Sequence, residues 1–154
     1  MNKLILGLLL TIVPFIELRG GLPFLILHAK EQGLTIWPFL ILVLIINSLV
    51  VLLVYFFLDQ IHHRLLRNKF YERKFNNYLR RSQNKIKRFQ RHHKKLGFIA
   101  LTLFTAIPLP ITGAYSATLI SWLTGLNRVK SFISIVLGLM ISETIILLIT
   151  LGLI

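Results

Sequence analysis

The stretch LILGLLLTIVPFIELRGGLPFLILHA, residues 4–29, decides the fold. Most of it is apolar enough to enter a lipid bilayer, yet Glu17 and Arg19 lie inside it, shortly after Pro14. Ionisable side chains are costly at membrane depth, and a proline interrupts the helix that would otherwise satisfy the backbone there. We therefore interpret this stretch as a broken helix that contributes to a binding site within a membrane.

The composition is that of an integral membrane protein. Of the 154 residues, 55% are hydrophobic and only 15% are charged, whereas soluble domains have about 25% charged residues. Residues 36–58 and 97–125 carry no charged side chain, and residues 131–154 carry only Glu143. These runs exceed the roughly 18 residues that indicate a membrane span. Because helices satisfy their own backbone in lipid, the expected fold class is all-α.

The chain divides into two apolar halves that repeat one order of parts, namely a broken segment, a short polar loop and an unbroken span. Interrupted segments at matching positions of two halves are typical of transporters built from inverted repeats. The predicted parts are a first repeat at residues 1–58 (broken segment 4–29, transmembrane helix 36–58), a linker at 59–96, and a second repeat at 97–154 (broken segment 97–125, transmembrane helix 131–154).

The charge of the loops predicts the topology. The linker and the loop Asn127–Lys130 are both basic, and basic loops tend to be cytoplasmic. Residues 97–125 would then begin and end on the cytoplasmic side, as a re-entrant hairpin that turns near Pro108 to Gly113. By symmetry, residues 4–29 would form a second hairpin that enters from outside, with its tip at Glu17 to Gly20. The alternative is that residues 4–29 cross once, with a kink at Pro14. Either topology predicts a multi-pass protein of the cell membrane.

The linker predicts an amphipathic helix on the membrane surface. Residues 60–95 contain thirteen of the eighteen lysines and arginines, and apolar side chains recur among them near helical spacing. Such a helix binds anionic lipid headgroups, and no recognition fold for nucleic acid surrounds it. The side chains predicted to bind the membrane surface are Arg64, Arg67, Lys69, Arg73, Lys74, Arg80, Arg81, Lys85, Lys87, Arg88 and Arg91.

The two expected tips contain the candidate binding residues. Arg19 suits a phosphate or carboxylate because its planar fork binds two oxygens, and a buried Glu17 could exchange a proton. Proline and glycine breaks free the N-termini of the following half-helices, which attract anions. An alternative is that Glu17 and Arg19 simply pair and fix the tip. The residues expected at the two tips are Glu17, Arg19, Gly20, Gly21, Pro108, Pro110, Thr112 and Gly113.

Each unbroken span has a polar pair near its centre, which contains Asn47 in the first and Glu143 in the second. Glu143 is a candidate for a second proton site or for a partner of Arg19. Asn47 is its counterpart in the first half. The alternative for both is a structural hydrogen bond between helices.

Two motifs resemble those of the small multidrug export family of prokaryotes. They are PxxExRGGxP at residues 14–23 and FxAIPxPxTGA at residues 104–114. That family in turn resembles the DedA and VTT-domain membrane proteins, which have two facing re-entrant hairpins and move lipids or polyprenyl phosphates. The resemblance implies functional roles for Glu17, Arg19, Pro108, Pro110 and Thr112. Unlike DedA proteins, this chain has no arginine between Lys95 and Arg128, so a homodimer would be needed to supply a second.

These observations lead to three functional hypotheses. The first is a proton-coupled transporter or flippase for an amphiphilic substrate, with an anionic, lipid-like headgroup favoured. The second is an exporter of cationic hydrophobic compounds that uses Glu17 and Glu143. The third is a membrane scaffold that recruits a partner or anionic lipid through the basic linker. The sequence contains no cysteine, nucleotide motif, nucleophile–base pair or metal-ligand spacing, so we expect no enzyme activity, cofactor or metal.

Overall fold

The structure is a computed structural model that describes residues 3–14, 16–66, 96–109 and 112–152. All regular structure in these ranges is helical, which confirms the predicted class. The helices in chain order are α1 (Lys3–Leu10), α2 (Glu17–Glu31), α3 (Trp37–Leu66), a helix at Leu96–Ala106, α5 (Ala114–Leu123) and α6 (Arg128–Thr150).

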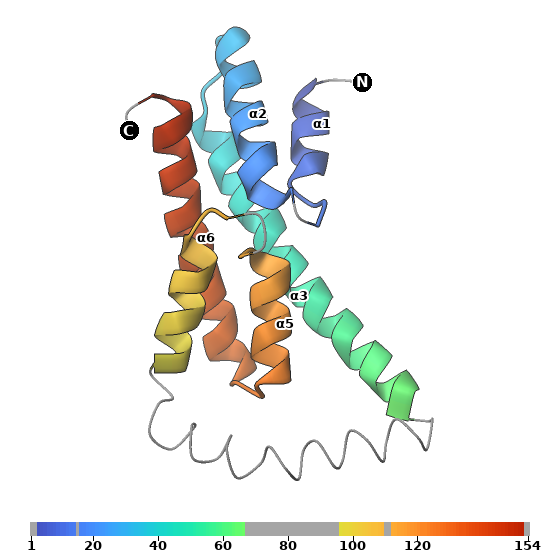
Figure 1. The fold of residues 1–154 in the computed structure, drawn as a ribbon. Helices are drawn as coiled ribbons and strands as arrows, with labels where there is room; N and C mark the ends of the chain where they lie inside the picture. The colour runs from blue at the N-terminus through green and yellow to red at the C-terminus, as the bar shows by residue number, and fades with distance from the viewer. Residues whose placement is uncertain (1–2, 15, 67–95, 110–111, 153–154) are drawn as a thin grey trace.

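Two helices run the full height of the molecule (Figure 1). The segments Trp37–Ile61 of α3 and Arg128–Thr150 of α6 are long and apolar enough to cross a membrane. Helix α3 continues past the predicted end at residue 58, into the basic segment. Helix α6 begins before the predicted residue 131, because the side chain of Asn127 accepts a hydrogen bond from the Lys130 N–H at 3.1 Å and caps the helix.

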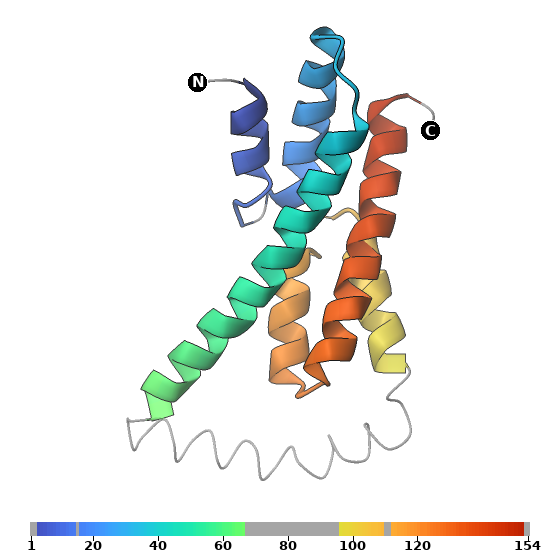
Figure 2. The ribbon, with the colours of Figure 1, turned by 180° about the vertical axis from the view of Figure 1, so that it is seen from behind.

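The first broken segment folds back on itself. Helices α1 and α2 lie side by side in the same half of the molecule, as both views show (Figures 1 and 2). Residues 11–16, which we call the first turn, join them and contain Pro14, where the sequence predicted a break. The two helices can approach closely because Gly7 has no side chain. A Cβ at that position would lie only 2.7 Å from the side chain of Leu25. The chain therefore does not continue straight from residue 4 to residue 29.

Two details of this segment differ from the prediction. The tip of the first segment was expected at Glu17 to Gly20. The chain reverses before these residues, in the first turn, because α2 already begins at Glu17. The glycine pair and Pro23 all lie inside α2 and do not break it. Gly21 instead allows α1 to approach, since a Cβ there would lie 2.8 Å from the backbone nitrogen of Thr11.

The second broken segment lies in the opposite half of the molecule (Figure 1). The helix Leu96–Ala106 rises to mid-height, and α5 descends from there. We call the described residues between them, 107–109, 112 and 113, the second turn. Helix α6 packs tightly against Leu96–Ala106 at Gly138, which has no side chain. A Cβ there would lie 2.7 Å from the Thr102 carbonyl oxygen. The two turns therefore meet near the middle of the molecule.

The apolar side chains form both a core and an outer surface. Leu22 and Leu25 of α2, Val51 of α3 and Ile135 of α6 are fully buried. Large apolar side chains also face outward; Leu53 on α3, for example, is 65% exposed. Soluble proteins rarely expose large contiguous apolar surfaces. Such a surface suits contact with lipid.

Candidate functional site

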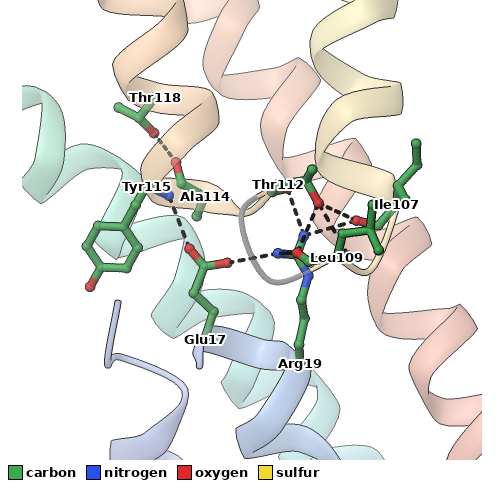
Figure 3. Close-up of polar contacts among 8 residues, drawn as sticks. All are labelled: Glu17, Arg19, Ile107, Leu109, Thr112, Ala114, Tyr115 and Thr118. Carbon is green, nitrogen blue, oxygen red and sulfur yellow. Dashed lines mark hydrogen bonds and ion pairs between the residues drawn. The ribbon is translucent and has the colours of Figure 1, made fainter. Parts of the chain in front are cut away.

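The two turns bring charged side chains and irregular backbone together at the centre of the molecule (Figure 3). Glu17 and Arg19 lie at the N-terminal end of α2, and their side chains face the second turn and the start of α5. Both side chains are withdrawn from solvent, with Arg19 10% and Glu17 4% exposed. The first broken segment thus supplies both charges, and the second supplies mainly backbone groups.

The guanidinium of Arg19 binds backbone carbonyls of the second turn. Its Nη2 donates to the carbonyl oxygens of Ile107 at 3.1 Å and Thr112 at 2.7 Å, and its Nη1 donates to that of Leu109. These carbonyls follow Ala106, the last residue of the helix Leu96–Ala106, and so belong to backbone outside any helix, which needs other hydrogen-bond partners. Arg19 therefore satisfies the backbone where the helix Leu96–Ala106 has ended.

The carboxylate of Glu17 contacts the N-terminus of α5, which carries partial positive charge. Its Oε1 accepts a hydrogen bond from the Tyr115 N–H at 3.3 Å. Gly113 is the N-cap residue of α5 and has no side chain to cap the helix. A Cβ at Gly113 would overlap the Glu17 carboxylate, so the absence of a side chain there makes room for it. Glu17 thus caps a helix to which it does not belong.

The two charges are close but incompletely bonded. Nη1 of Arg19 lies 3.9 Å from Oε2 of Glu17, which is an ion pair but longer than a hydrogen bond. Glu17 Oε2 and Arg19 Nε are buried and have no hydrogen-bond partner. Glu17 also has a φ of 45°, in the left-handed region that a non-glycine residue seldom adopts. Such strain is typical of functional sites.

Two further side chains fix the turns. The Thr112 hydroxyl donates to the Ile107 carbonyl at 2.6 Å and so closes the second turn. The Tyr115 hydroxyl donates to the carbonyl of Ile12 in the first turn. The sequence analysis missed Tyr115, and its only signal is a polar aromatic residue soon after the Thr112-Gly113 break. Thr112 therefore stabilises the second turn, and Tyr115 joins the start of α5 to the first turn.

The comparisons with known proteins identify the family. A family model described as "Putative small multi-drug export protein" matches residues 17–145, which is most of the chain and includes both sides of this site. The chain belongs to this family. Searches of curated proteins and of solved structures find no significant match. The family and the two long apolar helices together indicate a membrane protein.

The structure brings together part of the candidate set in this small multidrug export protein. Glu17, Arg19, Thr112 and Gly113 meet at the centre (Figure 3). Pro108 lies between two residues whose carbonyls bind Arg19. Pro110 lies outside the described residues.

The expected role of the glycine pair in binding is not supported. Gly20 and Gly21 lie inside α2, so no half-helix begins after them. Their missing side chains face Ile16 and Thr11, respectively. Their small size serves close packing at the first turn.

Asn47 and Glu143 are buried in the long helices, apart from the central network. The Asn47 amide donates to the Val43 carbonyl of its own helix at 2.9 Å. Asn47 Oδ1 and Glu143 Oε1 are buried and have no hydrogen-bond partner. Among the described residues, no ion pair joins Glu143 to Arg19, so the expected partnership is not seen.

A second polar cluster, not predicted from the sequence, joins α3 to the end of α5 and the start of α6. Both Asp59 carboxylate oxygens accept from the Arg128 guanidinium, at 2.7 and 2.9 Å, and Trp122 Nε1 donates to Asp59 at 3.0 Å. One helical turn before Asp59, Tyr55 is hydrogen-bonded to Ser121. These contacts anchor the lower half of α3 to the second broken segment.

The remaining predictions concern metals and the basic linker. In the part of the chain that the structure describes, no three His, Asp or Glu side chains are grouped so as to hold a metal ion. Arg64 lies near the end of α3 and is exposed. All other residues predicted to bind the membrane surface lie in 67–95, outside the described residues.

Proposed function

We propose that this protein is a small transporter or flippase, not an enzyme, and that its two broken segments are re-entrant hairpins that enter the membrane from opposite sides as an inverted repeat. Helix lengths support this proposal. Helix α5 has 10 residues and α1 has 8, which at 1.5 Å per residue gives about 15 and 12 Å. Each reaches about halfway through a hydrocarbon core of about 30 Å.

The observation that carries the proposal is the network of Glu17, Arg19 and the second turn. Irregular backbone at membrane depth is tolerated only where protein buries it or a cavity adjoins it, and ionisable groups there mark transport pathways. Broken helices that meet at mid-depth form the binding sites of many transporters. The proposed substrate site is therefore the meeting point of the two turns.

The chemistry of this site favours an amphiphilic substrate with an anionic headgroup. The N-terminus of α5 and Arg19 both attract oxyanions. Glu17 provides a carboxylate that can carry a proton, which would couple transport to a proton gradient. The two spans of one chain are few for enclosing a pathway, so we propose a homodimer surrounded by membrane lipids.

The topology can be tested with single cysteines, because the chain has none of its own. Cysteines placed at residues 2, 32 and 128 should be labelled by a membrane-impermeant maleimide, with 2 and 32 reacting outside the cell and 128 only after the membrane is opened. Labelling of 2 and 32 from opposite sides would show that residues 4–29 cross once and would overturn the re-entrant arrangement.

Transport itself can be tested in vesicles that contain the purified full chain. A lipid phosphate with a fluorescent label on its tail should become accessible to an external quencher faster than in protein-free vesicles, and an inward proton gradient should change the rate. Equal rates with and without protein, for every headgroup charge tried, would contradict the proposal.

The description of the family favours a second candidate, the export of cationic hydrophobic compounds. In that case the carboxylates Glu17 and Glu143 would carry the function. Replacing Glu17 by glutamine should then abolish drug resistance of an expressing cell, whereas replacing Arg19 by alanine should have little effect. The proposed anionic substrate predicts a large effect of the Arg19 change, so the two variants separate the candidates.

A further inference from the structure

We propose that the Glu17 carboxylate occupies the site that the headgroup of the substrate takes during transport, so that an oxyanion displaces Glu17 when Glu17 takes up a proton. This inference rests on the proposed function and adds a coupling mechanism to it. The ligand class is a monoanionic oxyanion headgroup, such as a carboxylate, a sulfonate or a singly charged phosphate ester.

The first evidence is that the structure contains an anion site already filled by an anion. Helix α5, which has 10 residues, begins at Ala114, and the Tyr115 N–H in its first turn binds Glu17. The space above Gly113 is shaped for this carboxylate, because a Cβ there would overlap it. Glu17 belongs to α2 and not to α5, so the α5 N-terminus is capped by a residue of the other broken segment.

The second evidence is that this occupant is incompletely satisfied. Glu17 Oε2 and Arg19 Nε, which belong to side chains that are 4% and 10% exposed, have no hydrogen-bond partner. Glu17 also has an unusual φ of 45°, a strained conformation for a residue with a side chain. A buried donor left without an acceptor is itself costly. An oxyanion from outside could bind the α5 N-terminus without that strain.

The third evidence is the charge balance. With Glu17 ionised, its charge and that of Arg19 cancel. When a proton from water binds Glu17, its attraction to the α5 N-terminus weakens and Arg19 is left without a counter-charge. One monoanionic headgroup then restores neutrality, so one proton enters for each anion and no covalent bond changes. By linkage, anion binding must also favour protonation of Glu17.

Other ionisable groups could produce a pH dependence, and they define the controls. Arg19 and the backbone N–H of Tyr115 contact Glu17, and the Tyr115 hydroxyl is directed to Ile12. Among the described residues, no hydrogen bond or ion pair joins Glu17 to the ionisable side chains of α1, α3 and α6, the helices that pack against α2. The ionisable residues of these helices whose side chains the structure describes are Lys3, Tyr55, Asp59, Arg64, Arg128, Lys130 and Glu143. His28, near the far end of α2, is hydrogen-bonded to the Phe24 carbonyl at 2.9 Å, and its Nε2 lies 3.9 Å from Glu31.

The test compares binding of octanesulfonate and methanesulfonate to the purified full chain in nanodiscs. Both probes have a sulfonate whose charge is constant between about pH 6 and pH 8. Wild-type affinity for octanesulfonate should rise as the pH falls, by at most about tenfold per pH unit because one proton is linked. Glu17→Gln should bind at least about tenfold more tightly than wild type at pH 8 and should lose the pH dependence.

Matched variants make the result decisive. Glu143→Gln and His28→Gln should keep the wild-type pH dependence. If Glu17→Gln does not fold, Glu17→Asp serves instead, because its shorter side chain places the carboxylate farther from the α5 N-terminus. This variant should also bind the probe more tightly than the wild type does. Methanesulfonate should bind more weakly than octanesulfonate. Equal affinities would still support displacement and would identify the headgroup alone as the ligand.

The inference is overturned if folded Glu17→Gln binds octanesulfonate no more tightly than wild type at pH 8, or if its pH dependence persists. If either result is found while the wild type transports lipid normally, the proposed function still stands. Tighter binding by Glu17→Gln without transport by the wild type would overturn only the proposed function.

Discussion

Replacing Arg19 by alanine should reduce lipid transport in vesicles at least about a hundredfold, which corresponds to about 2.7 kcal/mol. The change removes the donor to the carbonyls of Ile107, Leu109 and Thr112 and leaves the buried Glu17 carboxylate without its counter-charge. Removing one partner of a buried ion pair typically costs about 3–5 kcal/mol, so the melting temperature should also fall. Transport is measured per folded protein, after size-exclusion chromatography.

Two variants separate the loss of function from the loss of stability. Arg19→Lys keeps the charge but cannot satisfy three carbonyls with a planar fork, so intermediate transport is expected. Arg128→Ala removes an arginine whose side chain is 61% exposed and lies in the Asp59 cluster, and it should change transport less than about threefold. Transport by folded Arg19→Ala at the wild-type rate would show that the meeting point of the two turns is not the substrate site.

The sequence predicted the helices well where a chemical signal was strong. Long runs with at most one charged side chain predicted both long helices, and Pro14 and Pro108 both lie where a helix is interrupted. Pro23 and the pair Gly20-Gly21 carry similar signals but lie inside α2. A propensity of about 1–3 kcal/mol against a helix can be offset by packing, and at Gly21 the close approach of α1 requires a small residue. Local propensity alone could not distinguish a break from a packing contact.

The candidate site was predictable only through its side chains. Glu17 and Arg19 stand out because charge is rare at membrane depth, and Thr112 and Gly113 because they follow a proline-rich break. The carbonyls of Ile107 and Leu109 and the N–H of Tyr115 belong to the backbone, which every residue has. No residue type marks them, so their role depends on the tertiary arrangement.

The same limit applies to long-range pairs. Asp59 and Arg128 are separated by 69 positions, and neither lies in a motif. Only the packing of α3 against α6 brings them together. A sequence pattern can indicate which face of a helix is buried, but it does not indicate which distant residue a side chain on that face will contact.

Replacing Gly113 by alanine should reduce transport about tenfold or more and destabilise the protein by about 1–2 kcal/mol, the usual cost of losing a helix cap. The backbone at Gly113 has φ −96° and ψ −165°, which alanine can adopt, so the effect comes from space and not from conformation. The new Cβ would overlap the Glu17 carboxylate and force it off the Tyr115 N–H. Thermal unfolding and vesicle transport measure the two effects.

Gly97→Ala is the matched control, because its new Cβ would meet only Leu126, at 3.5 Å, and should be tolerated. A double-mutant cycle then isolates the contact with Glu17. Glu17→Gly removes the carboxylate and relieves its positive φ. In that background Gly113→Ala should cost little further stability, since the space is empty. An equal cost in both backgrounds would mean that Gly113 serves something other than the carboxylate, and that Glu17 does not cap α5 in the working protein.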